Sequence, residues 1–333
     1  MHRLKCHDCG SFRMEALQFT SSISSRVTKS LERTVLELRK EMSIKALSKY
    51  LGLHWDTVKN IEKKHLKRKY KTIRLTDVKA IGIDEVYMGK QTGNKGYLTI
   101  VRDLGSGAVL FVGQGKSGES LNGFIQKVNR SRATIETIAV DLAPSFTSWI
   151  QHYFPKALIV YDHFHVIKLM NDKLNNIRRR TMSNLEELEK KALKNRRWHF
   201  VKNQENLNPK AKQELEQCKE VFADMATAHY LKESLRNIYS FADSKDLADI
   251  AFKRWYKLAN ATEIPEMKTM AKTVKKHIDG ILAYWQTGGM TSASMEGFNN
   301  KIGWLTRQAY GYRDQEYLIL KIYDLPEMKV NKK

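Results

Sequence analysis

The sequence predicts a mixed α/β domain that is interrupted by a long all-helical segment and preceded by a helix-turn-helix. Residues 42–66 read as two short amphipathic helices separated by a glycine. Residues 78–180 alternate between short β-type runs and helical runs, and residues 181–285 lose the β signal. We therefore expect a short cysteine-containing segment (1–15), a helix-turn-helix with a basic linker (16–75), the first part of the α/β core (76–180), a helical insertion (181–285), a last core helix (286–325) and a basic tail (326–333).

The charge of the chain is strongly positive and unevenly distributed. The net charge is +22, and residues 1–80 hold 19 Lys and Arg against 8 Asp and Glu, whereas residues 81–165 hold 8 against 7. Such an excess indicates a polyanionic partner. No basic amphipathic segment ends in a membrane anchor, and no run is long enough to span a bilayer, so we favour nucleic acid over a membrane surface. Three cysteines cannot form a disulfide framework, and the N-terminus has no apolar signal region, which predicts a cytoplasmic protein.

The N-terminal segment contains Cys6-x-x-Cys9, which is half of a zinc-ribbon ligand set. No second CxxC and no suitable Cys/His pair follows at ribbon spacing. We therefore expect no closed Zn²⁺ site, and we interpret the pair as an orphaned half-site; two free thiols are the alternative.

Residues 42–66 predict a helix-turn-helix. Leu47 and Leu51 form one apolar stripe, Val58 and Ile61 begin another, and Gly52 breaks the helix between them. An ordinary helical hairpin is the alternative, but a dense cationic run directly follows the second helix and suits phosphate contacts. The residues expected to contact DNA from this segment are Trp55, Asp56, Thr57, Lys59, Asn60, Lys63, Lys64, Lys67 and Arg68.

The α/β segment contains three strands linked by glycine-bearing turns, followed by alternating helices and strands. We expect strands at Val78–Met88, Tyr97–Asp103 and Ala108–Gln114, a helix at Ser117–Val128 capped by Ser117, a strand at Thr137–Asp141, a helix at Pro144–Tyr153, a strand at Ala157–Asp162 and a helix from His163 towards Arg180. This order is that of an RNase H-like domain, in which the first and fourth strands are neighbours.

Three carboxylates are candidates for a metal site. Asp84 lies among apolar residues of the first strand, and Asp141 closes the fourth. Carboxylates in apolar strands are costly without partners, and a divalent cation is a suitable partner. Glu296, expected near the start of the last core helix, would complete an oxygen-rich site for Mg²⁺ or Mn²⁺. Glu85 should point to the opposite face of its strand and is not expected to be a ligand.

Two such cations can activate a water or a 3′-hydroxyl and stabilise the leaving oxygen, so the site can cut DNA and join it. Taken singly, each aspartate is also consistent with a turn cap or an ion pair, and Glu296 with a carboxylate at a helix N-terminus. Asp162 and His165, at the end of the fifth strand, are expected to assist the site, with a packing or capping role equally favoured. Further backbone contacts to DNA are expected from Lys301, Arg307 and Arg313.

Three separated segments carry a resemblance to a known family. They are IGIDEVYMGKQTGNKGYLTIVRDLGSGAVLFV, AVDLAPSFTSWIQHYFPKALIVYDHFHVIKLMND and SASMEGFNNKIGWLTRQAYGYRD. In this order, with a long helical stretch before the third, they resemble the transposases of the bacterial ISL-three insertion-sequence family. The resemblance implies an RNase H-like catalytic core with a helical insertion, and it carries the catalytic DDE triad onto Asp84, Asp141 and Glu296. It also matches Asp162-x-x-His165 to an auxiliary block.

The resemblance implies a DDE transposase that binds the terminal inverted repeats of its element. Its expected cofactors are two Mg²⁺ or Mn²⁺ ions, and its partners are the double-stranded DNA of the element ends and of the target. Bridging two ends implies at least a homodimer, and the expected location is the bacterial cytoplasm, at the nucleoid. Such proteins open with CxxC…CxxC, so we expect an N-terminally truncated copy. The alternatives are a catalytically idle remnant that binds DNA sequence-specifically, and a structure-specific nuclease.

Overall fold

A computed structural model describes residues 3–14, 18–21, 27–89, 96–142, 144–183, 185–291 and 293–326. Most of the expected basic tail therefore lies outside the described residues. The chain forms two compact units, residues 1–74 together with 305–333, and residues 75–304. This division differs from the predicted one, because it groups the end of the chain with the N-terminal segment. Every helix within the described ranges is too short or too polar to cross a membrane.

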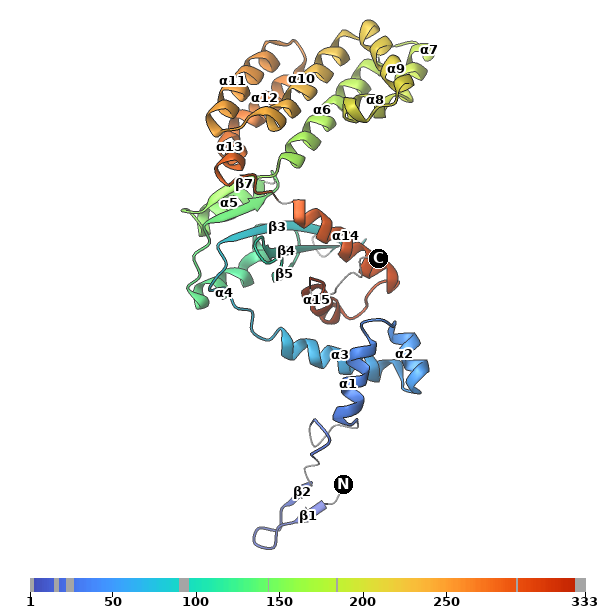
Figure 1. The fold of residues 1–333 in the computed structure, drawn as a ribbon, viewed down its shortest axis with the longest axis vertical. Helices are drawn as coiled ribbons and strands as arrows, with labels where there is room; N and C mark the ends of the chain where they lie inside the picture. The colour runs from blue at the N-terminus through green and yellow to red at the C-terminus, as the bar shows by residue number, and fades with distance from the viewer. Residues whose placement is uncertain are drawn as a thin grey trace. The chain divides into compact units, whose positions relative to one another are not determined.

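The first unit contains a β-hairpin and four described helices (Figure 1). Its elements are β1 (Arg3–Lys5), β2 (Phe12–Met14), α1 (Lys29–Leu38), α2 (Ile44–Leu51), α3 (Trp55–Lys69) and α15 (Gln315–Asp324). The hydroxyl of Ser43 accepts a hydrogen bond from Ala46 N and caps the start of α2. Gly52 ends α2 with a φ of 64°, a left-handed conformation that glycine adopts without strain.

The predicted helix-turn-helix is confirmed in α2 and α3. Val35, Leu47, Val58 and Ile61 form its buried core, and Leu53 packs against them. The core thus joins α1 to both helices of the motif and leaves the opposite face of α3 exposed.

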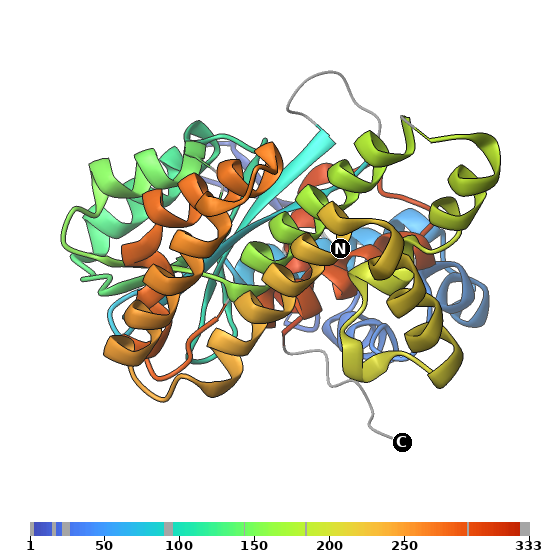
Figure 2. The ribbon, with the colours of Figure 1, turned by 90° about the horizontal axis from the view of Figure 1, so that it is seen from above.

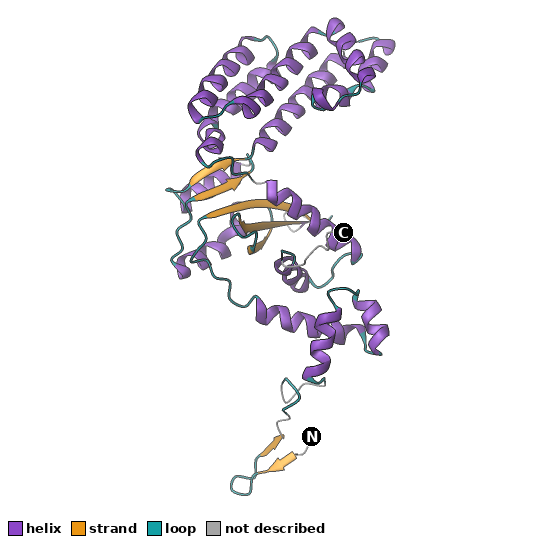
Figure 3. Ribbon diagram, in the orientation of Figure 1, coloured by secondary structure: helices purple, strands orange, loops and turns teal. Residues whose placement is uncertain are grey.

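The second unit is built on a five-stranded mixed sheet (Figure 3). Its strands are β3 (Ala80–Tyr87), β4 (Tyr97–Asp103), β5 (Val109–Gln114), β6 (Thr137–Val140) and β7 (Leu158–Tyr161), in the spatial order β5-β4-β3-β6-β7. The first three strands pair antiparallel, and β3, β6 and β7 run parallel. This is the predicted RNase H-like arrangement, with the first and fourth strands of the sheet side by side. Along the chain, η2 (Gly118–Leu121) and α4 (Asn122–Ser131) lie between β5 and β6, and α5 (Pro144–Tyr153) lies between β6 and β7.

The helix predicted from Ser117 begins later than expected. A 3₁₀ turn, η2, precedes α4, and Ser117 makes no side-chain capping bond, so that expectation was wrong. Ser120 instead donates through its backbone and its hydroxyl to the Ser117 carbonyl. A Cβ at Gly118 would lie 2.8 Å from the Trp149 ring, so the turn packs tightly against α5. The conformation of this segment is determined by tertiary packing rather than by the local capping preference of Ser117.

The predicted insertion contains helices and no β-strand among its described residues. After β7 the chain forms the predicted helix α6 (His163–Ser183), which extends into the insertion, and then α7 (Glu187–Lys194), α8 (Arg197–Val201), η3 (Gln204–Asn206), α9 (Pro209–Val221), α10 (Ala223–Phe241), α11 (Lys245–Ala261), α12 (Pro265–Lys276) and α13 (Ile278–Gln286), before it enters α14 (Ala293–Gln308). The long helix α6 packs along α10 and α12 (Figure 2).

Tryptophans in a helical insertion are expected to be core residues rather than platforms for DNA bases, but Trp198, Trp255 and Trp285 do not behave alike. Trp255 is buried, and its indole donates to the Leu231 carbonyl. Trp285 is partly buried and donates to the Ala242 carbonyl. Trp198 is 57% exposed, which corrects the expectation for that residue. It lies on α8, a helix of only five residues, which buries a single side chain, Phe200.

Candidate active site

The sheet brings Asp84, which lies within β3, close to Asp141, which directly follows the neighbouring parallel strand β6. Gly82 in β3 is paired with Ala139 in β6. Continuing this register by two residues places Asp84 beside Asp141. Their proximity is also electrostatic, because the charge of Asp141 contributes to raising the pKa of Asp84. The structure therefore assembles two of the three predicted carboxylates.

Asp84 is held on both carboxylate oxygens. Its Oδ1 accepts from the backbone N–H of Glu85 at 2.8 Å, and its Oδ2 accepts from the amide Nδ2 of Asn299 at 2.7 Å. Burial is the main cause that raises the pKa of Asp84, and these hydrogen bonds and the nearby His165 oppose it. The result is an oriented, poorly solvated carboxyl group, which suits a cation ligand.

Glu85 belongs to the same electrostatic cluster, which alternation along the strand does not reveal. Burial raises its pKa to about 7, with further contributions from the charges of Asp141 and Asp84, while Lys116 opposes the shift. Alternation along the strand predicts Glu85 on the face opposite to Asp84. The structure instead brings it within electrostatic range of both aspartates.

Glu296 is not brought to the aspartates in the structure. It is exposed in the first turn of α14, and no three His, Cys, Asp or Glu side chains among the described residues are close enough to hold a metal ion. The expected convergence of three carboxylates is therefore not observed. Asn299 lies three residues further along α14, roughly 4.5 Å along the helix axis, and it makes the contact with Asp84.

The start of α14 is fixed to the sheet by Arg102, a buried residue of β4. Its Nη1 donates to the Ser294 carbonyl at 2.8 Å, its Nε and Nη2 donate to the Gly107 carbonyl, and its guanidinium lies 4.1 Å from the centre of the Phe298 ring. A Cβ at Gly82 would lie 2.9 Å from the Met295 sulfur, so glycine permits the close approach of this helix. The one sequence signal for Arg102 is a cation inside an otherwise apolar strand.

Asp162 and His165 have different surroundings. Asp162 is 2% exposed, and its Oδ1 accepts from Phe164 N at 2.9 Å, which caps the start of α6. His165 lies close enough to Asp84 to stabilise its charge. Of the alternatives that the sequence left open, the geometry favours capping for Asp162 and a place beside the aspartates for His165.

The residues around Asp84 fit a hard divalent cation. Mg²⁺ is commonly bound by one or two carboxylates, with water and substrate phosphate completing its shell. Asp84 and Asp141 supply these carboxylates. The side-chain Oδ1 of Asn299 is buried and has no hydrogen-bond partner among the described residues, which leaves an amide oxygen for a cation or its water. Cys6 and Cys9, by contrast, lie where the β1–β2 hairpin turns, with Cys9 Sγ 3.0 Å from Ser11 Oγ.

The raised pKa values predict that Mg²⁺ binding depends on pH. Asp84 and Glu85 hold protons more strongly than free carboxyls, so a cation must displace them. We expect the increase in Tm caused by Mg²⁺ to grow as pH rises through about 7, the pKa of Glu85. Without metal the pH dependence has the opposite sign. The folded chain holds more protons than the unfolded chain, so the free energy of unfolding decreases as pH rises towards 7. Thermal melts at a series of pH values, with and without Mg²⁺, measure the increase in Tm, and the double variant Asp84→Asn/Glu85→Gln is the control. Equal Mg²⁺ effects at every pH would contradict it.

The residues expected to contact DNA from α3 fall into two groups. Asn60, Lys64 and Arg68 are exposed, as is 49% of Trp55, and Lys64 Nζ lies 3.1 Å from Ser21 Oγ and 3.9 Å from the carboxylate of Glu32. The cations on the side of α3 facing α15 are already paired with carboxylates: Lys59 lies 3.9 Å and Lys63 2.8 Å from Asp314, and Lys67 lies 2.6 Å from Glu316. Asp56 and Thr57 are partly exposed, and Lys301, Arg307 and Arg313 are exposed.

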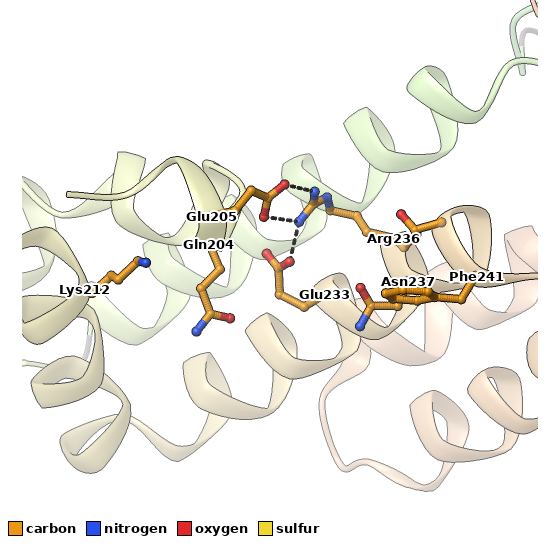
Figure 4. A pocket seen from close by; sticks show the side chains of 8 residues that line it. Gln204, Glu205, Lys212, Glu233, Arg236, Asn237 and Phe241 are labelled. Carbon is orange, nitrogen blue, oxygen red and sulfur yellow. Dashed lines mark hydrogen bonds and ion pairs between the residues drawn. The ribbon is translucent and has the colours of Figure 1, made fainter. Parts of the chain in front are cut away.

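A hollow of about 500 Å³ lies in the helical insertion and is not part of this site. Arg236 is held there between Glu205, at 2.6 Å, and Glu233 (Figure 4). Because these charges are paired within the wall, the hollow offers no free cluster for catalysis.

Comparisons with known proteins give matches along most of this chain. A family model described as "Transposase" matches residues 81–322, and the helix-turn-helix domain of transposase family ISL3 matches residues 24–66. The transposase for insertion sequence element IS1001 of Bordetella parapertussis is 30% identical over 96% of this chain and 78% of its own length. The transposase for insertion sequence element IS1557 of Mycobacterium tuberculosis (strain H37Rv) is 26% identical over 88% of this chain and 70% of its own length.

Among solved structures, a chain of the Drosophila P element transposase strand transfer complex aligns with a TM-score of 0.42 and 12% identity. The alignment covers 76% of this chain and 77% of that one.

Proposed function

The chain belongs to the transposase family ISL3, and from that premise we propose that it cuts and joins DNA at a metal site built on Asp84 and Asp141. The observation that carries the proposal is the closeness of these two aspartates on adjacent parallel strands, with Asp84 partly buried and hydrogen-bonded on both oxygens. Glu296 is proposed as the third catalytic carboxylate, because it lies one helical turn from the Asn299 that contacts Asp84.

When bound, two Mg²⁺ or Mn²⁺ ions would stabilise the attacking and leaving oxygens of a phosphodiester. The role of the chain is to hold and orient them. Asp84 and Asp141 offer carboxylate oxygens, and Asn299 fixes the orientation of Asp84. His165 places a nitrogen base beside the same carboxylate, where it is suited to contact the phosphate or exchange a proton with it. Asp162 acts indirectly, by fixing the start of the helix that carries His165.

We propose that α3 recognises the terminal inverted repeats of the element. Its exposed face carries Asn60, Lys64 and Arg68, an amide suited to base edges and two cations suited to phosphates. Lys301, Arg307 and Arg313 are proposed to add backbone contacts. Holding two element ends for joining requires at least a homodimer on the bacterial chromosome.

The test is cleavage of a labelled duplex that carries the element end, in the presence of Mg²⁺ or Mn²⁺. We expect Asp141→Asn to reduce cleavage on the order of 1,000-fold and to leave DNA affinity nearly unchanged, because an amide cannot replace a charged ligand. Glu136→Gln is the matched control. Glu136 is an exposed carboxylate just before β6, whereas Asp141 directly follows the strand.

Two results would overturn parts of the proposal. Normal cleavage by Asp141→Asn would remove this residue from the site. Specific binding without cleavage by the unaltered chain would contradict catalysis and leave a protein that binds DNA only.

A further inference from the structure

A second hollow, of about 220 Å³, lies between α6 and α8. Its lining from α6 includes Phe164, Ile167 and Asn171, which are spaced along one face of that helix. Phe164 directly precedes His165, and the centres of their rings are 5.6 Å apart. The hollow therefore begins close to the residues that directly follow β6 and β7, because these strands pair Val140 with Tyr161 and α6 starts at His163.

The lining combines a stacking surface with an unsatisfied acceptor. The Phe164 ring is 46% exposed, and Ile167 and Val201 add apolar walls. The side-chain Oδ1 of Asn171 is buried and has no hydrogen-bond partner among the described residues. Because an unpaired buried acceptor is costly, a flat ligand that carries an N–H donor would stabilise this arrangement.

The rim of the hollow carries two exposed cations, Lys168 and Arg197. Asp172 is its one carboxylate among the described residues, so the rim has an excess of positive charge. A ligand that places a planar ring inside and a phosphate at the rim matches this distribution. A single nucleotide has this chemistry.

We propose that this hollow binds one unpaired nucleotide of the DNA beside the cleaved bond, with its base stacked on Phe164 and an N–H group donated to Asn171 Oδ1. The proposal rests on the proposed function, because it needs DNA at the aspartates. Unpairing one base would fix the register of the strand relative to the reacting phosphate, and binding the base in the hollow offsets the cost of unstacking it.

Both walls of the hollow are built before any ligand arrives. Val166 and Met170 are buried on the other side of α6. The end of α8 is fixed by the buried Lys232, whose Nζ donates to the carbonyls of Phe200 at 2.9 Å and Lys202 at 2.7 Å. A preformed site spends little free energy on ordering its side chains when it binds.

The experiment uses the full chain and element-end duplexes that each carry 2-aminopurine at one position near the cleavage site. Divalent metal is left out, so that no strand is cut. This base fluoresces more strongly when it leaves the stack. We expect the fluorescence of 2-aminopurine to increase on binding at one position and to stay unchanged at the neighbouring positions. Phe164→Ala and Asn171→Leu should each abolish this increase. The affinity for a duplex with an extrahelical base at that position should fall roughly 5- to 100-fold in Phe164→Ala.

Tyr230→Ala is the matched control, because Tyr230 is an exposed aromatic residue on α10 that does not line the hollow. It should keep the full response. Melting curves check folding, and the exposure of Phe164 predicts that its alanine variant folds. If the unaltered chain fails to bind the duplex, both the proposed function and the nucleotide site fail. If it binds and no position responds, or the Phe164 and Asn171 variants respond like the unaltered chain, only the nucleotide site fails.

Discussion

Replacing Glu296 with glutamine is expected to reduce metal-dependent cleavage of the element end on the order of 1,000-fold while DNA affinity stays within about twofold. Glutamine has nearly the same shape and helix preference, so the change removes a negative charge and little else. Glu296 is exposed in the first turn of α14, and that helix already contacts Asp84 through Asn299. Measuring both cleavage and binding of the same labelled duplex distinguishes the loss of a metal ligand from the loss of DNA recognition.

Asn299→Ala provides a graded comparison. It removes one hydrogen bond to Asp84 and the unpaired amide oxygen, and we expect a smaller loss of about 10- to 100-fold, typical of residues that orient a metal ligand. If Glu296→Gln cleaved normally while Asn299→Ala lost most activity, the third oxygen ligand would be Asn299 and the triad assignment would be wrong. If both retained activity, Glu85 would be the next carboxylate to test.

The local parts of this site could be predicted from the sequence because they depend on strand order. Asp84 and Asp141 each follow a recognisable apolar run, and the order of elements makes their strands neighbours. The contribution of α14 could not be predicted in the same way. The contact of Asn299 with Asp84 depends on how this helix lies on the sheet, which is decided by Arg102 and by the missing side chain at Gly82.

Prediction from sequence has the same limit in the first unit, which contains the helix-turn-helix. Gly52 and the stripes of apolar residues predict the helix-turn-helix, since they act within about twenty residues of chain. They contain no information about α15, which lies more than 240 residues further along the chain and pairs with α3 through Asp314 and Asp324. Several lysines that composition assigned to phosphate contacts are therefore already neutralised in the folded chain.

The strongest link between α3 and α15 is a buried group of charges around Glu62, which is 5% exposed. Its carboxylate accepts from Lys321 Nζ at 2.8 Å and Arg39 Nε at 2.9 Å, and also from the Tyr317 hydroxyl. Burial alone would raise the pKa of Glu62, but the charges of Lys321 and Arg39 outweigh it and lower the pKa. The carboxylate is thus stabilised only as long as both cations remain beside it.

Glu62→Leu is expected to destabilise this unit by about 3–5 kcal/mol, because it leaves Lys321 and Arg39 buried without their partner. The free energy of unfolding in urea, followed for the full chain, measures the loss, and affinity for the element-end duplex should fall with it. Glu187→Gln, which breaks an exposed ion pair with Lys190, should change stability by less than about 0.5 kcal/mol.

Two further measurements separate the loss of the ion pairs from a general packing defect at position 62. Adding Lys321→Met to Glu62→Leu should recover part of the stability, since one of the two unpaired buried cations is then removed. A double variant no more stable than Glu62→Leu would instead indicate a packing defect. The pH dependence gives the second check. A carboxylate whose pKa is lowered by folding contributes stability above its unfolded pKa and loses it as pH falls through the folded one. The difference between Glu62→Gln and the unaltered chain should therefore be full at neutral pH and shrink in acid.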